Sequence, residues 1–327
     1  MNELALASFA AANDTHLVGE PRSARFAAFK ARFDAGAELA RLRALGFRFV
    51  ARSDPAFPPL LDAIHDPPPG LFLRGDADIT LLARPAVAVV GARACSAYGR
   101  QVARGLCRDL AAAGLVVVSG LARGIDAEAH RGALEAGGVT AAVLGCGIDR
   151  DYPAAHRELA GQVAAAGLVV AEYAPGVEPA PWRFPARNRI VAGLCAATVV
   201  VEARERSGAL ITADFALEEG REVFAVPGEI TSGLSAGANA LLRLGATPLT
   251  CAQDVLESYG LTHRPAAAPA LGEAAATVLE RVRESALGAD ELGRLTGLAA
   301  GELAVALTEL ELTGAIREED GVYRAAS

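Results

Sequence analysis

Residues 86–119 read AVAVVGARACSAYGRQVARGLCRDLAAAGLVVVS, and this stretch decides the fold class. Two short valine-rich runs, 86–90 and 115–119, flank a segment whose apolar residues recur at helical spacing over 99–114. A strand, a helix and a second strand in this order form the unit from which parallel sheets are built. More apolar runs follow at 140–145, 168–173, 197–203 and 222–228, with helical segments between them. The alternation predicts an α/β fold with a Rossmann-like, doubly wound, mostly parallel sheet.

The chain on either side of this sheet has a different pattern. Residues 1–50 include segments with apolar residues at three- and four-residue spacing and are predicted to be helical, and we expect an N-terminal helical domain at 1–53, similar to SAM or helix-hairpin-helix domains. A proline-rich connector at 53–76, which cannot be a continuous helix or a central strand, forms the entry to a sheet domain that we expect at 54–260. An alanine- and proline-rich linker is predicted at 261–272. Residues 273–327 read helix, helix, helix, hairpin, the order of a winged-helix-like module.

Composition narrows the class of protein. The 327 residues carry a formal net charge of −8, which argues against unselective DNA binding. No stretch approaches the roughly 18 apolar residues of a membrane span, and no basic region opens the chain as in a signal peptide. The five cysteines lack metal-site or disulfide spacing. We expect a cytoplasmic protein without a membrane anchor, a metal or a cofactor.

Glycine-marked turns end the first strands of the predicted sheet. In chain order, these turns contain Gly91, Arg93, Ser96, Ser119, Gly120, Gly145 and Gly147. The carboxyl ends of parallel strands meet at one edge of the sheet, where ligands bind, and backbone N–H groups there favour an anion. Glycine would let a ligand approach the backbone closely. A structural alternative is an ordinary strand-to-helix turn, with Ser96 as the helix N-cap.

Two acidic groups near these turns have catalytic and structural interpretations. Asp126 and His130 lie four residues apart on one predicted helix, and we favour a local structural pair over catalysis. Glu202 follows the run that begins at residue 197, and we expect it to anchor neighbouring arginines electrostatically.

A basic and aromatic cluster, PWRFPARNRIVAG, occupies residues 181–193. Its candidate DNA-binding residues are Arg183, Phe184, Arg187, Asn188 and Arg189. Guanidinium groups that hold phosphates, beside rings that stack on bases, suit single-stranded nucleic acid. The alternative is a core tryptophan beside a solvated arginine face; two prolines favour the first interpretation, because they should keep the start of the segment out of a helix.

Taken together, these motifs resemble the DprA/Smf family. The resemblance rests on G-A-R-x-x-S-x-Y-G (91–99), S-G-L-A-x-G-I-D-x-x-A-H (119–130), V-L-G-x-G-x-D-x-x-Y-P (143–153), F-P-x-R-N-R-I-x-A-G-L (184–194), V-E-A-x-x-x-S-G-x-L-I-T-A (201–213) and R-E-V-F-A-V-P-G (221–228). It covers about residues 54–256. Family members often carry Lys-x-Asn after the Tyr-Pro, whereas Ala154 and His156 stand here. Either a contact to the DNA backbone is missing, or Arg150, Arg157 or Arg183 substitutes for it.

The resemblance implies a function. Such a protein captures and protects single-stranded DNA during natural transformation, helps to load the recombinase RecA onto it, and is not an enzyme. It would form a homodimer through the sheet domain. Arg93 would contact DNA, with residues 187–189 in the same basic pocket, and the dimer and RecA surface would include Leu241, Leu242 and Leu244 as exposed apolar contacts.

The C-terminal module lacks the positive charge expected of a domain that binds duplex DNA. Residues 271–327 carry five arginines against eleven acids, and the predicted third helix, 301–314, has three glutamates and no cation. Neutralisation of phosphates dominates affinity for DNA. We therefore expect a protein-interaction or autoregulatory role for this module.

Two enzyme classes share this kind of sheet. The core resembles nucleotide phosphoribohydrolases that activate cytokinins, which carry P-G-G-x-G-T-x-x-E, but the comparable turn reads PGEITSGLSAGAN (227–239). The first glycine turn also lacks the G-x-G-x-x-G of dinucleotide-dependent dehydrogenases. Both alternatives are disfavoured on these residues.

Overall fold

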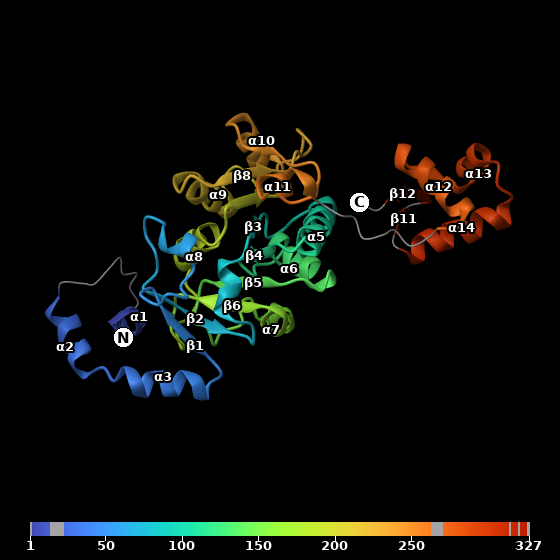
Figure 1. Ribbon diagram of the computed structural model, residues 1–327. Helices are drawn as coiled ribbons and strands as arrows, with labels where there is room; N and C mark the ends of the chain where they lie inside the picture. Colours follow the sequence, from blue (N-terminus) through green and yellow to red (C-terminus); the bar gives the residue numbers. More distant parts are fainter. Residues whose placement is uncertain (1, 14–22, 263–270, 314, 320, 326–327) are drawn as a thin grey trace. The chain divides into compact units, whose positions relative to one another are not determined.

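The computed structural model of the chain describes residues 2–13, 23–262, 271–313, 315–319 and 321–325 (Figure 1). The chain divides into two compact units, Met1–His263 and Arg264–Ser327. Most of the predicted linker, residues 263–270, lies outside the described residues. None of the helices in the described ranges is long and apolar enough to cross a bilayer.

The first unit is built on one sheet, whose strands lie in the order β1-β2-β6-β5-β4-β3-β7-β8-β9. The strands are β1 (Arg48–Ala51), β2 (Gly70–Arg74), β3 (Ala86–Val90), β4 (Val116–Ser119), β5 (Thr140–Leu144), β6 (Leu168–Ala171), β7 (Ala197–Val200), β8 (Glu222–Ala225) and β9 (Thr247–Pro248). Pairing is parallel from β6 through β9, whereas β1 and β2 are antiparallel to their neighbours. This confirms the predicted doubly wound, mostly parallel sheet.

The first two strands were not expected. Helices were predicted up to residue 50, and this is wrong for Arg48–Ala51, which forms β1. The connector also contains β2, which is paired on both sides. Its prolines precede the strand and therefore do not interrupt its hydrogen-bond ladder. Phe49 lies opposite Phe72, with ring centroids 4.8 Å apart, and local periodicity does not reveal such a cross-strand contact. A domain boundary at residue 53 stays a prediction.

Helices cover both faces of the sheet. One face is covered by α5 (Ala97–Ala112), α6 (Ile125–Glu135), α7 (Arg157–Ala166) and α11 (Ala252–Ser258). The other is covered by α4 (Pro59–Asp62), α8 (Arg183–Gly193), α9 (Gly208–Glu218) and α10 (Ala236–Arg243). The N-terminal helices are α1 (Asn2–Asn13), α2 (Ala24–Arg32) and α3 (Ala35–Ala44), and short 3₁₀ helices lie at Ile79–Ala83 and Ala154–His156.

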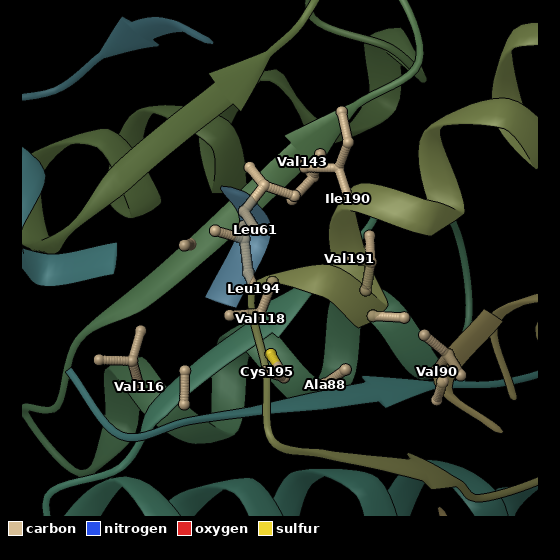
Figure 2. Packing of buried hydrophobic residues seen from close by; sticks show 14 of the residues in the cluster. Leu61, Ala88, Val90, Val116, Val118, Val143, Ile190, Val191, Leu194 and Cys195 are labelled. Atoms are coloured by element: carbon tan, nitrogen blue, oxygen red, sulfur yellow. The ribbon is translucent and has the colours of Figure 1, made fainter. Parts of the chain in front are cut away.

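Alternation along the central strand explains the two cores. On β3, Ala88 and Val90 face α8, while Val87 and Val89 face α5 and α6. Figure 2 shows Ile190 and Val191 of α8, and Leu194 directly after the helix, packed among buried strand residues on the face of the sheet that α8 covers. This apolar contact fixes α8 on the sheet, so that the first turns of the helix lie at the carboxyl edge.

The second unit has the predicted order of a winged helix. Its elements are α12 (Glu273–Glu284), β10 (Leu287–Gly288), α13 (Ala289–Thr296), α14 (Ala300–Leu312), β11 (Ile316–Glu319) and β12 (Val322–Ala325). The strands form a small sheet in the order β10-β12-β11. Val278, Leu292, Leu307 and Leu310 help to form its separate core.

Candidate nucleic-acid interface

The strand order creates a crevice. The chain runs outward from β3 through β4, β5 and β6, then crosses back by way of α8 to place β7 on the other side of β3. At such a switch point the loops after neighbouring strands diverge, and ligands bind outside their carboxyl ends. A cavity of about 380 Å³ lies there, between the loops after β3 and β7 and the first turns of α8 and α9.

The cavity gathers part of the predicted site. Of the predicted residues, those that line it are Gly91, Arg93, Phe184, Arg187 and Asn188. Arg93 is exposed, and its guanidinium carbon lies 5.4 Å from the centre of the Phe184 ring. The turn after β3 and the helix after β6 therefore contribute to one pocket, as the resemblance implied.

Two arginines at the cavity were missed. Arg204 and Arg206, in the loop after β7, are exposed and line the same space. The sequence held a signal for them, because both follow a predicted strand whose carboxyl end lies at the same edge of a parallel sheet as that of residues 86–90.

The start of α9 adds a favourable field for anions. Ser207 caps the helix by accepting a hydrogen bond from the Ala209 amide at 3.3 Å, and Ser207, Gly208 and Ala209 all line the cavity. The N-terminus of a helix carries partial positive charge and unpaired N–H groups. A phosphate in the cavity would meet this helix end as well as the guanidinium groups.

Ser96 positions the Arg93 loop. Its hydroxyl accepts from the Gly99 amide at 3.0 Å, which confirms it as the N-cap of α5. Both polar groups of Ser96 also donate to Glu202, the amide at 2.9 Å and the hydroxyl at 2.5 Å. The expectation that Glu202 anchors arginines is wrong: its buried carboxylate ties the loop after β3 to the loop after β7.

Arg187 forms the floor of the cavity and is 4 % exposed. It donates hydrogen bonds to the carbonyl of Gly120, at 2.9 Å, and to that of Val143. Burial lowers the pKa of its guanidinium, although nearby Asp126 opposes the shift. Burial likewise raises the pKa of the Asp126 carboxyl against the attraction of Arg187. The two groups form a buried charged layer beneath the cavity.

The predicted local pair of Asp126 and His130 is wrong. Asp126 accepts from the Ala122 amide at 3.3 Å, whereas His130 Nδ1 lies 2.7 Å from Thr140 Oγ1. Burial lowers the pKa of His130 to about 3, so the ring is neutral at physiological pH. The helix turns His130 toward the sheet while Asp126 faces the turn after β4.

The structure does not bring Arg183 and Arg189 into the cavity. Arg189 forms a buried bidentate pair with Glu172, at 2.9 and 2.7 Å, and contacts Asp66 at 3.0 Å. Arg183 donates to the Glu178 carbonyl and lies over the rings of Tyr173 and Trp182. The expectation that prolines keep this start out of a helix is wrong, because α8 begins at Arg183. Pro185 sits in the first turn, where its missing N–H is not needed.

The remaining predicted residues of the turns do not line the cavity and are instead in contact with other parts of the protein. Ser119 is buried and donates to the Val89 carbonyl at 2.6 Å. A Cβ on Gly120 would lie 2.5 Å from Arg187 Nη2, and one on Gly145 would lie 2.7 Å from the Phe184 ring. On Gly147 it would meet Asp149 Oδ1 at 2.7 Å. Close packing of the protein itself therefore accounts for these glycines.

Aromatic rings extend from the edge of the cavity. Tyr152 stacks on Phe184, with ring centroids 5.2 Å apart and planes at 28°. Tyr152 is 43 % exposed and Trp182 is 40 % exposed. Nearby, Arg150 and Arg157 are held in ion pairs with acids, and His156 is buried against the Leu121 carbonyl. Partly exposed aromatic rings beside a cationic pocket are an arrangement that suits the stacking of unpaired bases.

The α10 leucines differ in exposure. Leu244 is 82 % exposed, Leu242 is partly buried, and Leu241 is 6 % exposed within the core. The prediction that all three are exposed apolar contacts is therefore wrong for Leu241. Leu241 lies on the face of α10 that packs against β8, whereas Leu244 is the C-cap residue, where the helix ends and the side chain reaches solvent.

Family comparisons agree with this architecture. The family model of DNA recombination-mediator protein A matches residues 48–260, and that of the DprA winged helix domain matches residues 262–321. The chain is 49 % identical over 210 residues to DNA processing protein DprA of Streptococcus pneumoniae, covering 63 % of this chain and 72 % of the relative. It is 39 % identical over 279 residues to protein Smf of Escherichia coli, covering 82 % and 74 %.

Two solved structures are also similar. The X-ray structure of the Streptococcus pneumoniae protein superimposes with a TM-score of 0.67 at 41 % identity, covering 79 % of this chain and 93 % of that one. The DNA processing protein A of Helicobacter pylori, described for its mode of binding single-stranded DNA, gives a TM-score of 0.59 at 30 % identity. It covers 65 % of this chain and 95 % of its own.

Proposed function

Because the chain belongs to the family of DNA recombination-mediator protein A, we propose that it binds single-stranded DNA in the cavity between β3 and β7. The strand is held by its phosphates, with bases on the neighbouring rings. The similar Helicobacter pylori protein binds single-stranded DNA. The cavity offers the chemistry for the same ligand here.

One observation carries the proposal, namely where the unpaired cations lie. Within the described range 84–260, most arginines are engaged by carboxylates or carbonyls. Those with neither partner are Arg93, Arg123, Arg204, Arg206 and Arg243. All except Arg243 lie in loops at the carboxyl ends of β3, β4 and β7. Within this range of a chain of net charge −8, four of the five guanidinium groups without such a partner thus lie at one edge of the sheet.

The geometry favours a single strand over a duplex. The cavity is a recess between loops, with the Arg187 and Asp126 layer as its floor. A flexible strand can turn a phosphate into this space and lay its bases on Tyr152 and Trp182. Each stacked base contributes about 1–3 kcal/mol, and a duplex keeps its bases inside.

We assign a non-catalytic role to the site. Its two buried carboxylates are occupied: Glu202 accepts from Ser96, and Asp126 accepts from Ala122 beside Arg187. A carboxylate needs free access to a reacting atom to serve as a base or nucleophile. The protein would protect single-stranded DNA in the cytoplasm and help to load RecA onto it during natural transformation.

A comparison of strands tests the function. The full chain should bind a fluorescent thymidine strand of about 30 nucleotides at least about tenfold more tightly than the same length of duplex. With about three phosphates neutralised, affinity for the strand should fall roughly twentyfold between about 50 and 200 mM salt. Fluorescence anisotropy measures both. Equal affinity for duplex, or binding insensitive to salt, would contradict the proposal.

We also propose that the protein is a homodimer through the α10 surface, which includes Leu244. Leu244→Arg is expected to halve the mass measured by light scattering, because a buried unpaired charge opposes association. Leu45→Arg, at a leucine 50 % exposed in the N-terminal region, is the matched control and should leave the mass unchanged. A Leu244→Arg protein of unchanged dimeric mass would reject this surface.

A further inference from the structure

The exposed face of α14, in the winged-helix unit, has a pattern that DNA binding does not explain. On α14, Leu303, Ala306, Leu307 and Leu310 are buried in the unit's core. The opposite face of the same helix is also apolar: Val305 is 68 % exposed and Leu312 is 84 % exposed. A helix that is apolar on two opposite faces normally has a packing partner on each.

The two exposed apolar side chains, together with a glycine and a threonine, follow the spacing of a coiled-coil seam. Gly301, Val305, Thr308 and Leu312 are four, three and four residues apart, so they lie in one stripe along the exposed side. We call this set the α14 stripe. All four residues are exposed, and the stripe covers almost the full length of Ala300–Leu312.

Acidic side chains flank the stripe on both sides. Glu302 and Glu309 lie along one border and Glu311 along the other, which are the positions that face a partner's charges in a coiled coil. Glu302 and Glu309 also accept hydrogen bonds from backbone amides and thus keep their orientation. The described residues of this helix include no cation.

From this surface we infer that the α14 stripe docks an amphipathic helix of another protein, with an apolar seam bordered by lysine or arginine. Charge complementarity selects this occupant. A second copy of α14 would place glutamate against glutamate, which opposes pairing, and DNA phosphates would be repelled by the same acids. The inference is independent of the proposed DNA cavity, because no residue of the stripe belongs to that site.

The contact is expected to be weak and reversible. A seam of about three turns buries less than the roughly 1,200 Å² that marks the low end of stable interfaces. Attraction between the flanking charges would speed the encounter and select the orientation of the partner.

Synthetic helices test the inference on the full chain. The probe is a three-heptad peptide with leucine at a and d, lysine at e and g, and glutamine elsewhere; its comparison carries glutamate at e and g. Fluorescence anisotropy at physiological salt should show binding of the lysine peptide and none of the glutamate peptide. Absence of binding by the lysine peptide, or equal binding of both, would overturn the inference.

Variants separate the stripe from general attraction to an acidic protein. The double variant Val305→Gln, Leu312→Gln should lower the affinity for the lysine peptide about tenfold, because it removes the apolar seam. Glu311→Lys should lower this affinity several-fold. Glu280→Lys, the same charge change on α12, should alter the affinity less than about twofold. Equal effects of the two lysine variants would assign the binding to net charge alone and overturn the docking site.

All substituted residues are exposed, so circular dichroism melts should match those of the parent. Single-strand binding should be unchanged in every variant. Loss of peptide binding with intact DNA binding thus assigns the peptide site to the α14 stripe. Failure of the parent protein to bind DNA would contradict the proposed DNA cavity but not the docking site.

Discussion

Arg93→Ala is expected to weaken binding of single-stranded DNA by roughly ten- to hundredfold, which corresponds to about 1.5–3 kcal/mol for one charge-assisted contact. Arg93 is exposed at the cavity, has no carboxylate partner, and is held by the loop that Glu202 fixes through Ser96. The backbone that carries Arg93 is therefore already fixed, and its guanidinium, beside the Phe184 ring, is available for a charge-assisted contact with a phosphate.

The Arg93 prediction has a matched control. Arg43→Ala removes an equally exposed arginine without a partner from α3, far along the chain from the cavity loops. Fluorescence anisotropy at several salt concentrations should show a reduced salt dependence for Arg93→Ala, by about one phosphate equivalent, and no change for Arg43→Ala. Similar losses in both variants would mean that only net charge matters, and would remove the cavity as the binding site.

Arg187→Ala is expected to lower the free energy of unfolding by about 3–5 kcal/mol, because it leaves a buried charge and buried carbonyls without their partner. Arg187 donates to the carbonyls of Gly120 and Val143 and faces Asp126 beneath the cavity. Urea unfolding followed by circular dichroism measures the change. Loss of DNA binding with full stability would instead mean that Arg187 acts only as a contact.

The cost of removing Arg187 should depend on pH. The pKa of Asp126 is already raised by burial, and loss of Arg187 raises it further. A carboxyl whose folded pKa exceeds its unfolded value favours folding below the unfolded pKa, and this contribution is lost as the pH rises through the folded pKa. The difference in stability between parent and variant should therefore narrow as the pH falls toward about 4. A difference that widens on acidification would contradict the role given to Asp126.

The candidate site was partly predictable from particular residues. Gly91, Arg93 and Ser96 could be placed at the strand end, because a strand, a glycine turn and a helix follow one another without interruption. Arg204 and Arg206 carried the same signal after the fifth run and were overlooked. No signal of this kind separated Arg187 from Arg189, since both stand in one basic motif and differ only in what surrounds them.

The sequence by itself determined the order of the strands from the run at 86–90 to the run at 222–228, the edge at which their turns meet, and the winged-helix order at the end, because periodicity and turn residues act over a few positions. The tertiary structure alone decided which arginines face solvent. Arg189 is neutralised by Glu172, 17 residues away, and by Asp66, 123 residues away, while Arg93 finds no acid. A guanidinium is free or paired according to neighbours that only folding brings within a few ångströms, and local sequence does not record that distance.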